Sequence, residues 1–392
     1  MYYLCIINGR IYSNIMNRKN IILVVVLVVI VLVIGFVSHT GSSSSAVSDG
    51  NIKIGLIAPL SGDAATYGEP IQEGAQLALS ELNARSDAKY KYTLVAEDGK
   101  CTGKDAASAA QKLVNVDKVD FIVGGACSGE TLAVAPITEQ AKVILLSPSA
   151  SSPDITNSGP YTYRTVASDA EAGEYLGSYF KNKYSKIALL SEQTDYAQAI
   201  KQKIITKYTS LGGTVVFDES FQSNATDFKT ELTRVKQSGA EAFFINPQTE
   251  ANFTRVITQS KDLGLTMPLY GILFTSDAVA ANPAAKDVTM FDVPNVASDK
   301  FGQLFSQKFF AKYNKNPNYP YFAASAYEDI NLIAHGIEKN GPTPDGVKGY
   351  FDNLGDYNSS IGTFHFDQNG DAQGFNYLIK RVVNGHFVPV NN

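Results

Sequence analysis

From residue 52 onward, short apolar runs alternate with stretches in which apolar residues recur every three or four positions. Apolar runs typical of buried strands occupy residues 52–58, 92–96, 121–123 and 143–146. Helical spacing joins Ile71, Ala75 and Ala78 after the first run, and further helices are predicted around residues 106–113 and over 132–141. This alternation predicts an α/β fold with a doubly wound parallel sheet that is covered by helices on both faces.

A second series of the same kind follows, and then the pattern changes. Strands are predicted at residues 186–190, 214–217 and 242–245, and helices near 170–184, 197–211, 228–237 and 251–263. Successive helices then occur near residues 299–313, 323–335 and 346–354, and late strands near 363–366 and 375–383 flank a turn at 367–371. About 340 residues exceed a single typical core, so we expect two α/β lobes.

An unbroken run of 17 apolar residues, 21–37, precedes this region. Three cations and no acidic residue lie before the run, and a Ser/Gly tether follows at residues 38–51. A helix of about 17–25 apolar residues can cross a bilayer, and the cations favour a cytoplasmic N-terminus. We expect residues 1–20 to form a short cytoplasmic tail and the run to form a single-pass anchor. The remainder would lie on the extracytoplasmic side, in the periplasm or outside the cell.

Two alternatives concern this N-terminal region. One is a cleaved signal peptide, whose apolar region is usually about 7–15 residues long and ends in a small-residue cleavage site. The run is longer than that, and the residues after it do not make a good cleavage site. No cysteine follows the run, so lipid attachment there is excluded. Met16 opens a compact basic leader and is an alternative start, in which case residues 1–15 are an extension.

Charge excludes one class of partner. Three of the 33 basic residues precede the apolar run and all 38 acidic residues follow it, so the exported part carries a net charge of −8. Such a surface repels polyanions, and we expect no nucleic-acid partner.

Cys101 and Cys127 are the only cysteines after the apolar run, since Cys5 precedes it. Outside the membrane such a pair most simply forms a disulfide, worth roughly 3–4 kcal/mol in the chain-entropy picture. Two free buried thiols and a catalytic Cys127 are the alternatives.

Three predicted strand ends are rich in small and hydroxyl residues, at 59–62, 124–129 and 147–152. Ligands of open parallel sheets bind beyond the carboxyl ends of the strands, and the free N–H groups of a helix N-terminus suit a carboxylate. Helix capping by serine is the alternative explanation of each serine taken alone.

Enzyme signatures are missing from the sequence. No G-x-G-x-x-G follows the first strand, and Walker, G-x-S-x-G and H-E-x-x-H motifs are absent. The four histidines are scattered along the sequence. Residues 367–371 resemble the start of a calcium-binding loop, but the twelfth position of that loop would be Leu378, where the loop needs Glu. We therefore expect neither an enzyme nor a metal site, and no cofactor.

Several segments together resemble the leucine/isoleucine/valine-binding proteins, which are type I periplasmic solute-binding proteins of branched-chain amino acid ABC transporters. The resemblance rests on Ile54-Gly-Leu-Ile-Ala-Pro-Leu-Ser-Gly-Asp63, Tyr67-Gly68, Gly74-Ala75, Asp98-Gly-Lys-Cys101, Cys127-Ser128, Ser147-Pro148, Arg164-Thr165, Asp195-Tyr-Ala197 and Ala326-Tyr-Glu328. It covers nearly all of residues 52–390.

This resemblance implies two lobes joined by three crossovers, with the ligand in the cleft between them. We expect residues 52–168 and 296–358 in lobe I, and residues 169–295 and 359–392 in lobe II. The family's disulfide matches Cys101 and Cys127. The resemblance also implies the ligand contacts: carboxylate at Ser128 and Ser151, ammonium at the backbone carbonyl of Ser149, and aromatic contacts from Tyr67, Tyr196 and Tyr327.

The sequence departs from the family pattern at two places. A family tyrosine falls on Gln248, and the acid that neutralises the ligand ammonium falls near Leu273. Asp277 or Glu250 are the candidate replacements. Without one of them a buried ammonium would lack its counter-charge, which favours a carboxylate without an α-amino group or a neutral amide.

We therefore expect the solute-binding component of an ABC importer for an apolar, amino-acid-like carboxylate. Its partners would be the small ligand, a transporter permease and, through the N-terminal helix, the membrane, and it would act as a monomer. A sensor module that works through a separate membrane partner is the alternative class.

Overall fold

The computed structural model describes residues 4–7, 10–13, 50–273, 276–292, 296, 299–375 and 377–390. The chain divides into two units, Met1–Ala46 and Val47–Asn392. In the first unit, β1 (Leu4–Ile7) and β2 (Arg10–Ser13) pair as an antiparallel hairpin. The predicted anchor at 21–37 lies outside the described residues. Within the part of the chain that the structure describes, no helix is both long and apolar enough to cross a bilayer.

Five parallel strands form the first sheet of the larger unit, in the order β4-β3-β5-β6-β7. Their bounds are β3 (Asn51–Ala58), β4 (Lys91–Asp98), β5 (Phe121–Gly124), β6 (Ile144–Ser147) and β7 (Thr162–Arg164). The connecting helices are α2 (Ala65–Ala84), α3 (Gly103–Lys112), which continues as a π-helical turn at Leu113–Asp117, and α4 (Ser128–Ala141). The predicted strands and helices of this region are confirmed, and β7 is an addition.

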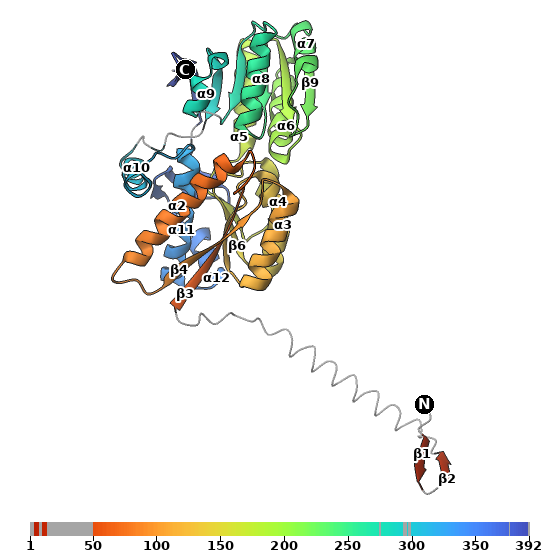
Figure 1. The fold of residues 1–392 in the computed structure, drawn as a ribbon, viewed down its shortest axis with the longest axis vertical. Coiled ribbons are helices and arrows are strands. Elements are labelled where there is room, and N and C mark those ends of the chain that lie inside the picture. The colour runs from red at the N-terminus through yellow and green to blue at the C-terminus, as the bar shows by residue number, and fades with distance from the viewer. Residues whose placement is uncertain are drawn as a thin grey trace. The chain divides into compact units, whose positions relative to one another are not determined.

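Both faces of this sheet are covered, which explains why its strands read as continuous apolar runs. Successive side chains of a strand point to opposite faces. Ile54 and Leu56 of β3 therefore pack into the cluster that includes α2 and α11 (Pro320–Asn340), whereas Ile57 packs with α3 and α4. Figure 1 shows these two pairs of helices on either side of the sheet.

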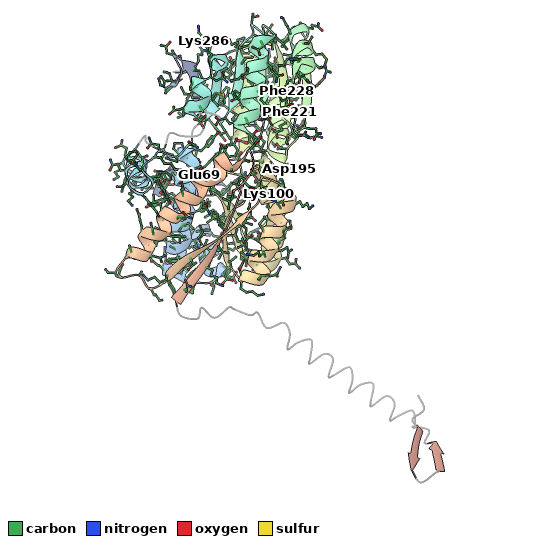
Figure 2. The ribbon with its side chains drawn as sticks, viewed as in Figure 1. Glu69, Lys100, Asp195, Phe221, Phe228 and Lys286 are labelled. Carbon is green, nitrogen blue, oxygen red and sulfur yellow. A yellow bond between two sulfur atoms is a disulfide. The ribbon has the colours of Figure 1, made fainter. Side chains whose placement is uncertain are left out.

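Seven strands form the second sheet, in the order β17-β16-β12-β11-β10-β8-β9. The neighbouring parallel strands are β8 (Lys186–Glu192), β9 (Thr214–Phe221), β10 (Ala242–Asn246), β11 (Leu269–Ile272) and β12 (Thr289–Asp292). β16 (Leu378–Val383) pairs antiparallel with β12, and β17 (His386–Pro389) pairs antiparallel with β16. The helices are α5 (Asp169–Lys183), α6 (Asp195–Ser210), α7 (Lys229–Gln237), α8 (Glu250–Asp262) and α9 (Asp277–Ala281). Phe221 and Phe228 pack edge to face in this part, with ring centroids 4.9 Å apart (Figure 2).

We call the residues around the five-stranded sheet the first lobe and those around the seven-stranded sheet the second lobe. The chain passes between the lobes three times. It enters the second lobe between β7 and α5, returns between β12 and α10 (Lys300–Tyr313), and leaves again between β15 (Ala372–Gln373) and β16. Both α11, which packs along α2, and α12 (Pro344–Asp352) belong to the first lobe.

A small sheet of β13 (Tyr357–Ser359), β14 (Gly362–Phe366) and β15 corrects one predicted boundary. The N–H of Arg164 in β7 donates to the carbonyl of Gly370 (3.0 Å), and Ser360 donates through its N–H and its hydroxyl to Glu328 in α11. The assignment of residues 359–392 to the second lobe is therefore wrong for 359–373, because their hydrogen bonds are made with the first lobe.

Asp329 of α11 is a buried acid that is expected to lower stability at neutral pH. Its Oδ1 accepts from the Thr165 hydroxyl (2.7 Å), and its Oδ2 has no hydrogen-bond partner among the described residues. Burial raises the pKa of this carboxyl well above its usual value. The folded state therefore holds the proton to a higher pH than the unfolded state, so stability is lost as pH rises from about 4 toward the folded pKa.

Asp329→Asn is accordingly expected to stabilise the protein by about 1 kcal/mol or more at pH 8, with a smaller gain at pH 5. Denaturant unfolding of variant and wild type at both pH values measures the two gains. A gain that does not grow with pH would contradict this account of Asp329.

Candidate functional site: a cavity at the strand ends

A cavity lies where the carboxyl ends of both sheets face each other. It contains about 450 Å³ of space not filled by atoms, including the part open to solvent. The first lobe and the start of α11 contribute Tyr67, Ala126, Cys127, Ser128, Ser149, Ser151, Tyr319 and Phe322. The second lobe contributes Tyr196, Gln248 and Leu273.

The N-terminus of α4 forms one end of the cavity. The helix begins at Ser128, whose side chain is 2% exposed and whose hydroxyl oxygen accepts from the N–H of Ser152 (3.2 Å). This bond occupies a lone pair and leaves the hydroxyl hydrogen able to donate. The first N–H groups of a helix lack partners inside the helix and carry a partial positive charge. This end of the cavity therefore suits a carboxylate.

Serine hydroxyls hold the loop after β6 against the end of β5. Ser147 donates to the carbonyl of Gly125 (2.7 Å), and Ser149 donates to the carbonyl of Ala126 (2.8 Å). Since the hydroxyl hydrogen of Ser149 is engaged within the protein, this residue can offer a ligand its backbone. The contact between the Ser149 carbonyl and a ligand ammonium stays a prediction from the family resemblance.

Ser151 connects the cavity to a buried acid. Its hydroxyl donates to Oδ2 of Asp169 (2.7 Å), and its carbonyl accepts from the N–H of Asp169 (2.8 Å). Asp169 is the first residue of α5 and is 1% exposed. Burial raises the pKa of this carboxyl to about 7, while the Ser151 hydroxyl and the charge of Arg164 act in the opposite direction.

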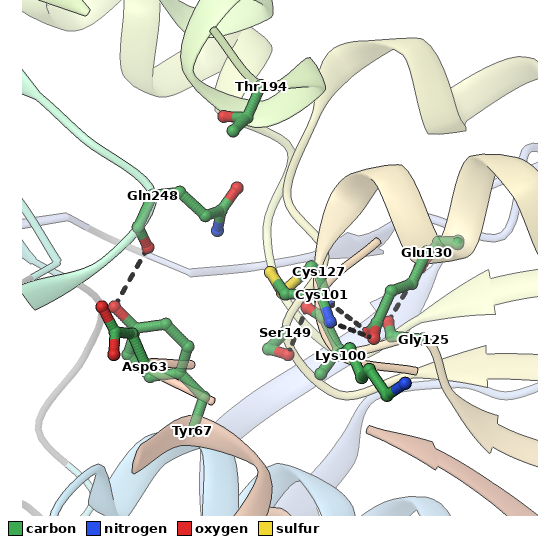
Figure 3. Close-up of a disulfide and its surroundings, with 12 residues drawn as sticks. Asp63, Tyr67, Lys100, Cys101, Gly125, Cys127, Glu130, Ser149, Thr194 and Gln248 are labelled. Carbon is green, nitrogen blue, oxygen red and sulfur yellow. Dashed lines mark hydrogen bonds between the residues drawn. A yellow bond between two sulfur atoms is a disulfide. The ribbon is translucent and has the colours of Figure 1, made fainter. Parts of the chain in front are cut away.

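A disulfide between Cys101 and Cys127 anchors the start of α4, with the two Cα atoms 5.3 Å apart. The carboxylate of Glu130 accepts from the N–H of Cys101 (2.9 Å) and from the N–H of Cys127 (3.0 Å), as Figure 3 shows. Burial raises the pKa of Glu130 to about 7. A Cβ on Gly125 would lie 2.4 Å from Cβ of Glu130, so only glycine allows this close approach.

Non-reducing peptide mapping of exported protein is expected to yield one linked Cys101–Cys127 peptide. Reduction should lower the free energy of unfolding by about 3.5 kcal/mol for the loop of 26 residues. It should also weaken ligand binding, because Cys127 lines the cavity. Two cysteines that react freely with an alkylating agent before reduction would contradict the pairing.

Three aromatic rings form an apolar wall opposite α4. The rings of Tyr67 and Tyr319 meet edge to face at 4.9 Å, and those of Tyr319 and Phe322 stack at 5.6 Å. Burial raises the pKa of both tyrosines, so both hydroxyls stay protonated at neutral pH. This wall can receive an apolar side chain.

The Tyr67 hydroxyl links the two lobes across the cavity. It donates to the carbonyl of Gln248 (3.0 Å) and accepts from the N–H of Glu250 (3.0 Å), and Figure 3 shows the first of these bonds. Asp63 and Arg255 approach to 3.8 Å along the same junction. The lobes are therefore in contact beside the cavity.

Tyr196 is the second-lobe residue that we expect to contact a ligand. It follows the first residue of α6, lines the cavity and is 4% exposed. Its hydroxyl has no hydrogen-bond partner among the described residues. Buried hydroxyls are rarely left without a partner, and a group at a binding site commonly finds it in the ligand.

The structure brings six of the nine predicted ligand-site residues together on the cavity wall: Tyr67, Ser128, Ser149, Ser151, Tyr196 and Gln248. The other three lie elsewhere. The Tyr327 hydroxyl donates to Glu81 (2.8 Å) and accepts from Lys308 (3.1 Å). Asp277 is exposed at the start of α9, and the Glu250 carboxylate accepts from the Tyr319 hydroxyl.

Three residues that the sequence did not single out take part instead. Tyr319 and Phe322 occupy the wall where Tyr327 was predicted, because α11 begins at Pro320 and its first turn reaches the cavity. Asp169 accepts a hydrogen bond from the cavity residue Ser151, whereas neither Asp277 nor Glu250 lines the cavity. The only sequence signal for Asp169 was its place after Ser168, which reads as ordinary helix capping.

The sequence matches the family model described as "Periplasmic binding protein" over residues 51–385. It is similar to the leucine-, isoleucine-, valine-, threonine- and alanine-binding protein of Pseudomonas aeruginosa, at 27% identity over 86% of this chain and 92% of that protein. It is also similar to the Leu/Ile/Val-binding protein homolog 3 of Brucella melitensis, at 26% identity over 91% of this chain and 97% of that protein.

Solved structures of the same fold carry different ligands. The branched-chain amino acid substrate-binding protein LivJ of Streptococcus pneumoniae, in complex with isoleucine, aligns with a TM-score of 0.77 and 27% identity over 87% of this chain and 100% of that one. A solute-binding protein of Rhodopseudomonas palustris, in complex with 3,4-dihydroxybenzoic acid, aligns with a TM-score of 0.77 and 22% identity over 87% and 97%. At that lower identity the second alignment shows the fold alone.

Proposed function

This chain belongs to the periplasmic binding protein family, and from that premise we propose that it is the extracytoplasmic solute-binding component of an ABC importer, which captures an apolar amino acid between its two lobes. The proposal rests chiefly on one observation. The cavity joins a carboxylate-binding end, at the N-terminus of α4, to an aromatic wall of Tyr67, Tyr319 and Phe322. The relatives named for branched-chain amino acids support the same ligand class.

In this proposal the ligand carboxylate lies at the start of α4 and receives hydrogen bonds from backbone N–H groups and from the Ser128 hydroxyl. The apolar side chain lies against the aromatic wall, and Tyr196 contacts the ligand from the second lobe. A permease in the membrane then receives the ligand from the closed protein. Membership in the periplasmic binding protein family supports a solute-binding role.

Ser128→Ala is expected to weaken binding of leucine or isoleucine about tenfold or more, because a hydrogen bond to a charged group contributes roughly 1.5–3 kcal/mol. Isothermal titration measures the change. Thermal unfolding without ligand should show a loss of about 1–3 kcal/mol, because the buried N–H of Ser152 loses its acceptor. Ser108→Ala, at an exposed position of α3, is the matched control and should leave affinity unchanged. Unchanged affinity in Ser128→Ala would show that the ligand carboxylate does not bind at the start of α4.

A carboxylate without an amino group is the second candidate ligand class. Among the described residues, no acidic side chain lines the cavity, and Leu273 occupies part of the second-lobe wall. A buried ammonium without a counter-charge is costly. Benzoate-type acids and simple amides therefore belong in any ligand panel beside leucine, isoleucine, valine and phenylalanine.

We also propose that residues 21–37 anchor the chain in the cell membrane, with the binding lobes outside. The support is the sequence itself: 17 apolar residues with cations just before them and none just after them. The full-length chain is expected to stay with membranes through a high-salt wash and to be released by detergent. A soluble exported form that begins near residues 42–49 would show instead that the run is a cleaved signal.

A sensor that reports occupancy to a membrane partner would use the same cavity. Neighbouring permease and ATPase genes would support transport, whereas a neighbouring kinase or chemoreceptor gene would support sensing. We expect the binding unit to be a monomer in either role.

A further inference from the structure

An ammonium group in this cavity needs a negative charge nearby, and no described residue on the wall carries one. The inference below rests on the proposed function, because it concerns an amino-acid ligand. Two acids that the sequence suggested do not meet the need. Asp277 is exposed, and Glu250 lies behind Tyr319, which donates to its carboxylate.

Asp169 is a buried acid that accepts a hydrogen bond from a serine of the cavity wall. The Ser151 hydroxyl lines the cavity and donates its hydrogen to Oδ2 of Asp169 at 2.7 Å. A serine hydroxyl has one hydrogen and two lone pairs, so this bond turns a lone pair of Ser151 Oγ toward other donors. An N–H of the ligand's ammonium group would then donate to Ser151 Oγ. Two hydrogen bonds would connect the ammonium group to the Asp169 carboxylate through this hydroxyl. Opposite charges within about 4–6 Å stabilise each other's charged forms.

Asp169 forms no salt bridge with any of the described residues. The charge of Arg164 on β7 acts on Asp169, but its Nε bonds to Asp371 (2.6 Å) and its Nη1 to the carbonyl of Ser152 (2.7 Å). Tyr196 on α6 and Tyr377 before β16 are the titratable groups that face Asp169 from the second lobe, and both stay neutral because burial raises their pKa.

We propose that Asp169 is a positioning residue for ligand recognition: it orients the Ser151 hydroxyl as an acceptor and supplies the counter-charge of the ligand's ammonium group. The role separates amino acids from otherwise identical acids. A ligand without an ammonium group gains nothing from the negative charge and meets repulsion between its own carboxylate and Asp169.

The proposal predicts a pH dependence with a definite sign. Burial raises the pKa of Asp169 to about 7 without ligand, so the acid is partly protonated at neutral pH. An ammonium ligand binds the ionised form and drives the proton off. Affinity for an amino acid should therefore rise about tenfold between pH 6 and pH 8, with release of about half a proton at pH 7.

The test compares two ligand pairs by isothermal titration: leucine with 4-methylpentanoate, and phenylalanine with 3-phenylpropanoate. Each pair differs only in the amino group. Asp169→Asn should weaken binding of the amino acid about 10- to 100-fold, change binding of the deaminated acid by less than about threefold or strengthen it, and abolish the pH dependence. Glu171→Gln is the matched control, since it removes an exposed charge from the same turn of α5 and should change neither property.

Each other outcome decides against the inference. Equal weakening of both members of a pair, or an unchanged pH profile in Asp169→Asn, overturns it and leaves the proposed function in place. Failure of the wild type to bind either amino acid overturns both. If Asp169→Asn does not fold, proton release on ligand binding to the wild type provides the test. Titration in two buffers of different ionisation enthalpy should show proton release with leucine and none with 4-methylpentanoate. Binding of leucine without proton release overturns the inference.

Discussion

Replacing Arg164 with methionine is expected to lower the free energy of unfolding by about 3–5 kcal/mol, because it leaves a buried acid without its partner. The Arg164 side chain is fully buried, and its Nε bonds to Oδ1 of Asp371 at 2.6 Å. Its Nη1 and Nη2 donate to the carbonyl of Ser152 (2.7 Å) and to the hydroxyl of Thr156 (2.9 Å). Asp371 would remain 4% exposed without a cation.

The same substitution should disturb the ligand site, since Arg164 holds the loop that carries Ser149 and Ser151. Denaturant unfolding and leucine titration of the variant measure the two effects. Arg85→Met is the control: its ion pairs with Asp87 and Glu338 are partly exposed, and such pairs contribute about 0–1 kcal/mol. If Arg164→Met lost no more stability than Arg85→Met, the buried network would not hold the fold as argued.

Tyr196→Phe is expected to move stability and affinity in opposite directions. Without ligand, the variant should be more stable by about 1 kcal/mol, because a buried hydroxyl without a partner in the protein is removed. Affinity for an apolar amino acid should fall about 10- to 100-fold, since a hydrogen bond to the charged ligand is lost. Such opposed effects are typical of residues kept for function at the expense of stability.

Tyr208→Phe provides the matched control on the same helix. The Tyr208 hydroxyl donates to the carbonyl of Tyr184 (3.3 Å), so its loss should lower stability slightly and leave affinity unchanged. Thermal unfolding without ligand and titration with leucine, applied to both variants, give the comparison. A Tyr196→Phe protein that lost stability and kept its affinity would assign the hydroxyl a structural role.

The fold was largely predictable because the central strands of both sheets are covered on two faces. Such strands keep an apolar signature that needs no knowledge of their neighbours. The predictions failed where a segment depends on distant partners. β7 is only three residues long and ends in Arg164, whose buried guanidinium pairs with the distant Asp371. The same pairing draws residues 359–373 into the first lobe, and no local pattern could reveal it.

The site was predictable where it lies at strand ends and not where it depends on packing between elements. Ser128, Ser149 and Ser151 follow β5 and β6 directly, so topology alone places them together. Tyr319 and Tyr327 lie eight positions apart, which is about 12 Å along a helix, so only the register of α11 decides which reaches the cavity. Asp169 enters through the crossover after β7, and its neighbour Ser151 is distant in sequence.

Thermal unfolding of the protein with a panel of ligands tests most directly whether this cavity binds an apolar amino acid through its carboxylate. A ligand of the folded state stabilises it by RT ln(1 + [L]/Kd), about 2.7 kcal/mol at 100 times Kd. We predict that leucine, isoleucine, valine or phenylalanine raises the melting temperature in a saturable way, and that the shift disappears when Ser128 and Ser151 are both replaced by alanine. A panel without any amino-acid shift, or a shift that survives the double replacement, would contradict the account.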